Sequence, residues 1–205
     1  MIVIIDYGIG NPCSIVNMFK RINVEAVISS DVSDIEKAER LVLPGVGAFD
    51  NGMKKLNELG LVQVLNKKVL KNGTPILGIC LGMQLFGRKS EEGRLSGLGW
   101  LDAETVKFRF EGAGVGLKIP HMGWNTVRVL KDSFLFDGIE SEERYYFVHS
   151  YHMSCNQGSD IVAETHYGYD FISAVKKENI VGVQFHPEKS HRFGMKLLKR
   201  FVTGF

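Results

Sequence analysis

The chain has 205 residues, of which 44% are hydrophobic and 23% charged, and its formal net charge is +2. These values predict one globular domain over 1–205 and give no reason to expect a nucleic-acid partner. The apolar start "MIVII" is shorter than a signal peptide, and no run approaches the roughly 20 apolar residues that cross a bilayer, so we expect no membrane association. Three cysteines, Cys13, Cys80 and Cys155, favour a reducing, cytoplasmic setting over a disulfide scaffold.

The first part of the chain alternates predicted strands and helices. "IVIID" predicts a buried strand, and Asn11 and Pro12 after it are typical of the start of a helix. "RLVLPG" predicts a second strand, and apolar residues that include Leu59 predict one long helix over about 51–70. "PILGI" then predicts a third strand with a further helix behind it. Strands that alternate with helices indicate parallel pairing, because the crossover must return along the sheet.

From about Gly97 the pattern changes to short β-rich runs such as "RYYFVHSYHM", "FISAVKK" and "IVGVQFHP", with a final amphipathic helix around Phe193 to Phe201. These runs predict an antiparallel or mixed extension of the sheet. The fold class predicted for the chain is therefore α/β. We expect a central, mostly parallel mixed sheet flanked by helices, with a β-rich C-terminal half.

Cys80 lies between two glycines in "GICLG", where the third predicted strand turns into a helix. This is the G-x-nucleophile-x-G form of a nucleophile elbow, in which a sharp turn holds the reactive side chain at its apex. We expect the following helix to favour the thiolate, and the N–H of Leu81 to point where an oxyanion would form. A cysteine that merely packs in a tight turn is the alternative interpretation.

A thiolate nucleophile needs a base, and His186 in "VGVQFHPEKS" is the best placed of the six histidines. Glu188 is two residues further on, where an extended chain points it the same way. The pattern predicts a Cys–His–Glu triad, although an exposed His and Glu in a loop are also common. A metal site is the weaker alternative, because the only ligand-like spacing, His149-x-x-His152, places the two rings on opposite faces of a strand. We expect no metal and no cofactor.

The glycine-rich turn "LPGVG", Leu43 to Gly47, follows a predicted parallel strand, where open α/β sheets bind ligands. Its backbone N–H groups are candidates for the second half of an oxyanion hole. A phosphate loop is a poorer interpretation, because neither this turn nor "GIGNPC" has the lysine or the full G-x-G-x-x-G pattern.

Together "LPGVGAFDNGM", "GICLGMQLF" and "GVQFHPEKS" resemble the class I glutamine amidotransferases. Within that family, "IDYGIGN", "KIPHMGWN" and "YYFVHSYHM" resemble the glutaminase subunits of imidazole glycerol phosphate synthase, and the likeness covers essentially the whole chain. The resemblance implies that Cys80 attacks L-glutamine, that His186 protonates the departing ammonia and that Glu188 orients His186. It also implies an oxyanion hole from the backbones of Val46 and Leu81. The implied substrate-binding residues are Gly47, Gln84, Glu92, His149, Ser150 and Tyr151.

The chain offers no acceptor site for ammonia, so the resemblance implies a synthase partner in another polypeptide. In the family that partner is a (βα)8-barrel cyclase of histidine biosynthesis, and the two form a heterodimer. The positions that match its interface are Asn11, Trp124, Tyr146 and Lys189. We expect low basal activity that rises when the partner binds.

Other functions stay open at this point. "GLGWLDAETVKF" and the tail "KSHRFGMKLLKRF" resemble a paralogous branch that supplies ammonia to an ATP-dependent sugar amidotransferase in surface-polysaccharide biosynthesis. A γ-glutamyl peptidase on the same fold would work without a partner. A glutamine-binding module without catalysis is the non-enzymatic alternative.

Overall fold

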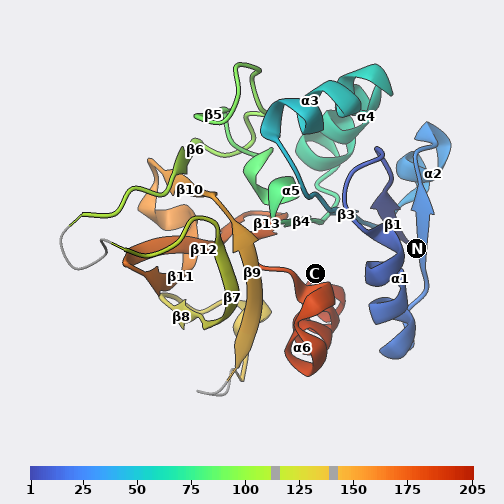
Figure 1. Cartoon of the computed structure of the whole chain (residues 1–205). Coiled ribbons are helices and arrows are strands. Elements are labelled where there is room, and N and C mark those ends of the chain that lie inside the picture. Colours follow the sequence, from blue (N-terminus) through green and yellow to red (C-terminus); the bar gives the residue numbers. More distant parts are fainter. Residues whose placement is uncertain (112–115, 139–142) are drawn as a thin grey trace.

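The structure is a computed structural model that describes residues 1–111, 116–138 and 143–205 (Figure 1). The strands are β1 (Ile2–Ile5), β2 (Ala26–Ser29), β3 (Arg40–Leu43), β4 (Ile76–Ile79), β5 (Lys89–Ser90), β6 (Ala103–Lys107), β7 (His121–Thr126), β8 (Arg128–Val129), β9 (Arg144–His149), β10 (Tyr151–Cys155), β11 (Ile161–Tyr167), β12 (Tyr169–Lys177) and β13 (Ile180–Val183). The α-helices are α1 (Pro12–Arg21), α2 (Val32–Lys37), α3 (Phe49–Glu58), α4 (Leu61–Asn66), α5 (Leu81–Gln84) and α6 (His191–Thr203). None of the helices in the described ranges combines the length and apolar composition needed to cross a membrane.

Over the described residues, eleven strands form one sheet in the order β2-β1-β3-β4-β13-β12-β10-β6-β5, with β11 beside β12 and β8 beside β11. The pairs from β2 through β1, β3 and β4 to β13 are parallel, whereas β12 is antiparallel to β13, β10 and β11. Strands β7 and β9 form a separate antiparallel pair. The predicted α/β class, with a parallel centre and a β-rich C-terminal half, is confirmed.

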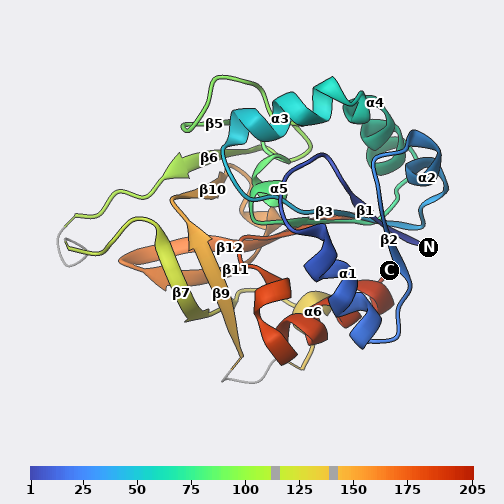
Figure 2. The ribbon, with the colours of Figure 1, turned by 45° about the vertical axis from the view of Figure 1, so that its right-hand side comes forward.

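Helices cover both faces of the parallel strands, because these strands are apolar on both sides. In β1, Val3 and Ile5 pack into the cluster beneath α3 and α4, while Ile2 and Ile4 pack into the cluster beneath α1 and α6. Figure 2 shows α3 and α4 on one side of the sheet and α1 and α6 on the other. All four side chains are buried, so the sheet is a rigid base for the loops at its edge.

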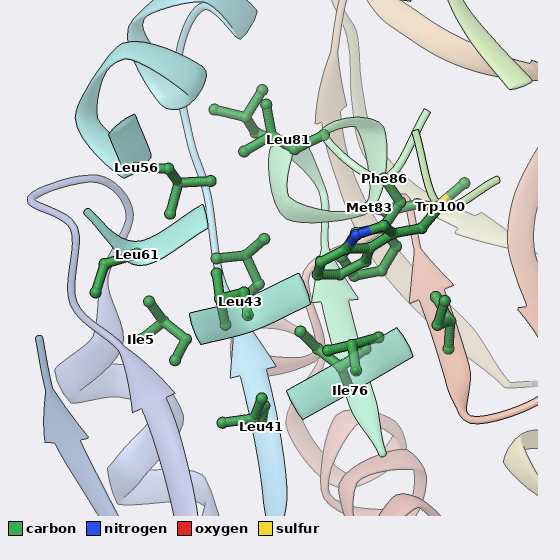
Figure 3. Packing of buried hydrophobic residues seen from close by; sticks show 14 of the residues in the cluster. Ile5, Leu41, Leu43, Leu56, Leu61, Ile76, Leu81, Met83, Phe86 and Trp100 are labelled. Atoms are coloured by element: carbon green, nitrogen blue, oxygen red, sulfur yellow. The ribbon is translucent and has the colours of Figure 1, made fainter. Parts of the chain in front are cut away.

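The prediction of a single helix over about 51–70 is wrong. The chain forms α3 and α4 with a break at Gly60, whose φ of +67° is the left-handed conformation that ends a helix, and continues as a π-helix over Lys67–Lys71. Because of the break, Leu56 and Leu61 both reach the face of the sheet (Figure 3), whereas Leu59, one of the apolar positions on which the helix was predicted, is exposed. The apolar spacing alone did not show where the helix turns.

One pairing brings the distant parts of the predicted site together. β13 lies next to β4 in parallel, with Val183 opposite Ile79. The residues that follow the two strands, from Cys80 and from Gln184, therefore leave the sheet at the same edge. β9 joins them there, because the backbone N–H of His186 donates to the carbonyl of Tyr146 at 2.8 Å.

Candidate active site

Cys80 occupies a strained turn between β4 and α5. Its φ is +53° and its ψ −109°, values that residues with a Cβ rarely adopt. The turn is held by a 2.8 Å hydrogen bond from the Cys80 N–H to the carbonyl of Val183. A Cβ added to Gly82 would lie 1.8 Å from the carbonyl oxygen of Leu43, so only glycine fits there. This is the geometry expected of a nucleophile elbow.

The helix after Cys80 contributes less than the sequence suggested. α5 is one turn long, from Leu81 to Gln84, so its dipole gives little stabilisation to a thiolate. What α5 supplies is position: the Leu81 side chain is buried in the cluster beneath α3 (Figure 3). Stabilisation of a charged sulfur must therefore come from side chains that face it.

His186 and Glu188 form a buried pair directly after β13. The Nδ1 of His186 is 2.7 Å from Oε1 of Glu188, and the two side chains are only 1% and 5% exposed. Since a carboxylate accepts hydrogen bonds, Nδ1 carries the proton and Nε2 is the nitrogen left to exchange one. Nε2 has no nitrogen or oxygen partner among the described residues. The contact is the one that the predicted orienting role of Glu188 needs, and the role itself stays a prediction.

The pKa of His186 is raised by its neighbours, Cys80 first among them. Burial alone lowers this pKa, but the negative charge of the Cys80 sulfur and then the Glu188 carboxylate outweigh burial and raise it to about 10. These two neighbours thus favour the protonated ring, the form in which His186 can act as a general acid.

The backbone donors expected to form an oxyanion hole are not both free in this conformation. The N–H of Leu81 donates to the carbonyl of Gly45, with the nitrogen and oxygen 3.4 Å apart. Because a trans peptide points its C=O and N–H in opposite directions, the N–H of Val46 is turned away from Leu81. Val46 is 50% exposed and Gly47 has φ +123°, a conformation that favours glycine. The oxyanion hole stays a prediction.

A cavity of about 330 Å³ adjoins the elbow, within the range of small-molecule sites. All of the predicted substrate-binding residues line it, as do Cys80 and the two predicted oxyanion-hole residues. The lining residues are Val46, Gly47, Ala48, Cys80, Leu81, Gln84, Glu92, Pro120, Val148, His149, Ser150 and Tyr151. Residues from five separate segments therefore meet at one opening beside the sulfur.

The hydrogen bonds of Gln84 limit what it offers to a ligand. Its Nε2 donates to the carbonyl of Tyr151 and to Oε1 of Gln184, both at 3.0 Å, which uses both of its N–H groups. The Nδ1 of His149 contacts the same Tyr151 carbonyl at 2.8 Å. That carbonyl therefore has both lone pairs occupied, and Gln84 presents only its Oε1 to the cavity.

Glu92 lies across the cavity in an exposed loop that α3 holds in place. Its Oε2 accepts a 2.9 Å hydrogen bond from the backbone N–H of Phe49 at the start of the helix. Asp50 returns the contact by accepting from the N–H groups of Arg94 and Leu95, which lowers the pKa of Asp50. The loop is thus tied to the start of α3 at two neighbouring points, with Glu92 at the cavity wall.

Sequence reasoning missed Gln184, which is fully buried and donates from Nε2 to the Sγ of Cys80 at 3.6 Å. Its position two residues before His186 on an extended segment was a usable signal, because such residues point the same way. Sequence reasoning also missed the contact between His121 and His149, whose Nδ1 and Nε2 are 3.1 Å apart. β7 and β9 bring this pair together, and no local motif announces it.

Three of the four predicted interface residues lie close together at the surface. Trp124 is 45% exposed and stacks on the ring of His191 with centroids 5.4 Å apart, and it meets Tyr146 edge-on. The ammonium of Lys189 lies 5.4 Å from the centre of the Tyr146 ring. The fourth, Asn11, is exposed at the start of α1, where its side chain accepts from the N–H of Ser14.

The sequence matches the family described as Glutamine amidotransferase class-I over residues 3–205. The chain belongs to this family, and it is a glutamine amidotransferase. It is 54% identical to imidazole glycerol phosphate synthase subunit HisH 2 of Methanococcus maripaludis and 49% identical to the subunit of the same name from Pseudomonas aeruginosa. Each alignment covers 98% of this chain and 98% of the relative.

Solved structures show the same fold. A crystal structure of a glutamine amidotransferase superposes with a TM-score of 0.74 at 20% identity, covering 98% of this chain and 96% of the other. The structure of PurLQS from Thermotoga maritima gives a TM-score of 0.69 at 16% identity, with coverages of 99% and 97%. At these identities the likeness establishes the fold alone.

Proposed function

We propose that the chain is the glutaminase subunit of an imidazole glycerol phosphate synthase and acts in histidine biosynthesis. It hydrolyses L-glutamine to glutamate and ammonia and delivers the ammonia to a synthase partner. Relatives of this name match at 54% and 49% identity over nearly their full length, which supports the assignment. The observation that carries the chemistry is the buried His186–Glu188 pair facing the Cys80 elbow.

The reaction begins when the Cys80 thiol gives its proton to Nε2 of His186. The thiolate attacks the side-chain amide carbonyl of glutamine and forms a C–S bond, and the carbonyl electron pair moves to oxygen. As the pair returns, the C–N bond breaks and His186 gives its proton to the departing nitrogen, releasing ammonia. Water, deprotonated by His186, then attacks the glutamyl thioester and restores the thiol and glutamate.

The cavity residues hold the substrate for this attack. Oε1 of Gln84 and the carboxylate of Glu92 are acceptors for the N–H groups of glutamine. The backbone of Gly47 and of His149 to Tyr151 supplies the remaining contacts. The Gly45–Val46 peptide must rotate before Val46 joins Leu81 in the oxyanion hole. Low activity of the isolated chain and a rise on partner binding follow from this rotation, and full activity without a partner would contradict it.

A glutamine analogue that carries a diazo-ketone tests the nucleophile. We expect stoichiometric labelling of Cys80, located by mass spectrometry of the digested protein. Cys13 is exposed and Cys155 is partly exposed, so both are internal controls. Burial raises the pKa of the Cys155 thiol to about 12, which leaves it unreactive at neutral pH. Labelling of Cys13 or Cys155 in place of Cys80 would overturn the triad.

The partner is a (βα)8-barrel cyclase that docks over the surface of Trp124, Tyr146 and Lys189, with Asn11 at its border. A covered cavity keeps ammonia away from bulk water, where it would be protonated and lose its nucleophilic electron pair. Purification of the tagged chain from its native cell tests this. We expect a cyclase to co-purify, and the substitution Trp124→Ala to weaken its binding about 10-fold or more. A co-purifying ATP-dependent sugar amidotransferase would assign the paralogous function.

Assay of the isolated chain separates the remaining alternative. A γ-glutamyl peptidase would release the amine from γ-glutamyl peptides as fast as ammonia from glutamine. We expect glutamine to be the preferred substrate, because a cavity of about 330 Å³ leaves little room for a second residue.

A further inference from the structure

A chain of hydrogen bonds between buried side chains ends on the sulfur of Cys80. It begins at the carbonyl of Tyr151, which accepts from Nε2 of Gln84 at 3.0 Å. The same Nε2 donates to Oε1 of Gln184 at 3.0 Å, and Nε2 of Gln184 donates to Sγ of Cys80 at 3.6 Å. The four residues come from β10, α5, the segment after β13 and the elbow, so they meet only when the polypeptide is folded.

The direction of every hydrogen bond in this series is determined by the carbonyl of Tyr151, at which the series begins. A backbone carbonyl only accepts, so Gln84 must turn its NH₂ group toward Tyr151. The second N–H of that group then donates to Gln184, which must turn its Oε1 toward Gln84. The NH₂ of Gln184 is left facing Cys80. The orientation of an amide is usually ambiguous, but here the fixed carbonyl removes the ambiguity.

In the part of the chain that the structure describes, the side-chain nitrogens of Gln84 and Gln184 have no hydrogen-bond partners other than these. Gln184 is fully buried and Gln84 nearly so, which keeps water from offering other partners. His149, also buried, gives the Tyr151 carbonyl its second donor and holds it in place. The donor that reaches Cys80 is therefore pre-oriented before any substrate arrives, which is the condition under which a hydrogen bond to a charge stabilises most.

We propose that Gln184 is a further catalytic residue, which stabilises the Cys80 thiolate by donating a hydrogen bond to its sulfur, and that Gln84 is the positioning residue that orients it. This inference rests on the proposed glutaminase function. Gln184 acts twice in that reaction, first when the thiol loses its proton to His186 and again when water expels the thiolate from the thioester. In the thioester itself the sulfur is uncharged and the bond is weak, so the donor favours breakdown of the intermediate.

The substitution Gln184→Met tests the donor, because methionine has a similar length and volume but no N–H. The measurement is the rate at which iodoacetamide alkylates Cys80 as a function of pH, read on the Cys80 peptide by mass spectrometry. We expect the pH of half-maximal rate to rise by about one unit, since a bond to a charged group is lost. Among the described residues, His186, backed by Glu188, and Tyr7 interact electrostatically with Cys80. The titratable groups Glu92, His149 and Tyr151 line the same cavity, and the substitution removes none of these residues.

Ser173→Ala is the matched control. Ser173 lies on β12 beside Gln184, whose N–H donates to its carbonyl at 2.9 Å, and its buried hydroxyl has no hydrogen-bond partner among the described residues. This variant should keep the pH profile of the unaltered protein. An unchanged profile in Gln184→Met, or an equal shift in Ser173→Ala, would overturn the proposal.

Gln84→Met provides an independent test one step from the sulfur, which also serves if Gln184→Met does not fold. Without the Gln84 donor, the amide of Gln184 is free to turn, so we expect an upward shift smaller than that of Gln184→Met. An unchanged profile in Gln84→Met would show that Gln84 does not orient Gln184. Diazo-ketone labelling of the unaltered protein keeps the two hypotheses apart: if Cys80 is not labelled, the glutaminase function itself fails.

Discussion

The two halves of the molecule contribute to the candidate site in different ways. The N-terminal half, with its parallel strands and covering helices, supplies Cys80 on an elbow whose geometry is built by neighbours in sequence and by apolar packing. The C-terminal half supplies His186, Glu188 and Gln184, which act through hydrogen bonds and charge. Buried histidines are found, among the described residues, only in this second half. The first half fixes the position of the proposed nucleophile, and the second places charged and hydrogen-bonding side chains beside it.

This difference shows which contact joins the halves. The parallel pairing of β13 with β4 places Val183 opposite Ile79, and the Cys80 N–H donates to the carbonyl of Val183. A shift of one residue in this register would turn Gln184 away from the sulfur, because side chains alternate along an extended segment. The proposed chemistry therefore depends on a sheet register as much as on the side chains.

The largest expected effect comes from removing either half's reactive group. We expect Cys80→Ala and His186→Ala each to reduce ammonia release from glutamine by at least about 10³-fold, and Glu188→Ala by about 10²-fold, because the carboxylate orients His186 and takes no part in bond making. Ammonia is measured in the presence of the synthase partner. Equal loss in all three variants would contradict a purely orienting role for Glu188.

A second substitution disturbs the packing of the elbow but leaves its reactive side chain in place. Gly82→Ala places a Cβ 1.8 Å from the carbonyl oxygen of Leu43, so β3 and α5 must separate. We expect the free energy of unfolding, measured in urea, to fall by about 3 kcal/mol or more. The control is Gly158→Ala in the C-terminal half, where an added Cβ meets nothing within 4 Å. A change within about 0.5 kcal/mol is expected there. Equal losses would mean that the elbow is not tightly packed.

Features encoded by neighbours in sequence could be predicted, and features that depend on distant packing could not. Short sequence motifs are enough to recognise the glycines around Cys80, the cap at Asn11 and the spacing of His186 and Glu188. The break at Gly60 did not, because the apolar spacing continues through it and Leu59 looks like a core residue. The bond from Leu81 to Gly45 and the contact of Gln184 with Cys80 form only when separate strands align. The spacing of Gln184 and His186 indicates only that their side chains point the same way, and it does not show which residue they meet.

The buried histidines make the C-terminal half sensitive to acid. Burial lowers the pKa of His121 from its ordinary value of 6.5 to about 4, and it also lowers the pKa of His149 and His152. Below pH 6.5 these histidines therefore bind protons in the unfolded chain but remain neutral in the folded chain. The contribution of these three histidines to stability should be full above pH 6.5 and fall as the pH drops toward 4, by about 3 kcal/mol for His121 alone at its limit. His186, whose pKa is raised, acts in the opposite direction and loses its contribution only as the pH rises toward 10.

Urea unfolding at several pH values between 7 and 4.5 checks this. His121→Gln keeps a donor that reaches toward His149 but does not titrate, so the stability of this variant should depend less on pH. The difference from the unaltered protein should grow as the pH falls, toward the limit of about 3 kcal/mol. Ser173→Ala removes a buried hydroxyl of the same half that has no hydrogen-bond partner among the described residues and does not titrate, so this control should retain the full dependence. The same slope in His121→Gln as in the unaltered protein would mean that folding does not lower the pKa of His121.

The smallest expected effect separates two roles of Asn11 in the N-terminal half. Its Oδ1 accepts from the N–H of Ser14 and caps α1, and the same exposed residue matches the family's partner interface. Asn11→Ala should lower the free energy of unfolding by about 1 kcal/mol, whereas Asn11→Asp keeps an acceptor and should cost a few tenths at most. Binding of the synthase partner, measured by calorimetry, then isolates the second role. If Asn11 donates to the partner through its amide, Asn11→Asp weakens binding without loss of stability. If it only caps the helix, Asn11→Asp binds like the unaltered chain, and the interface must be placed on Trp124, Tyr146 and Lys189 alone.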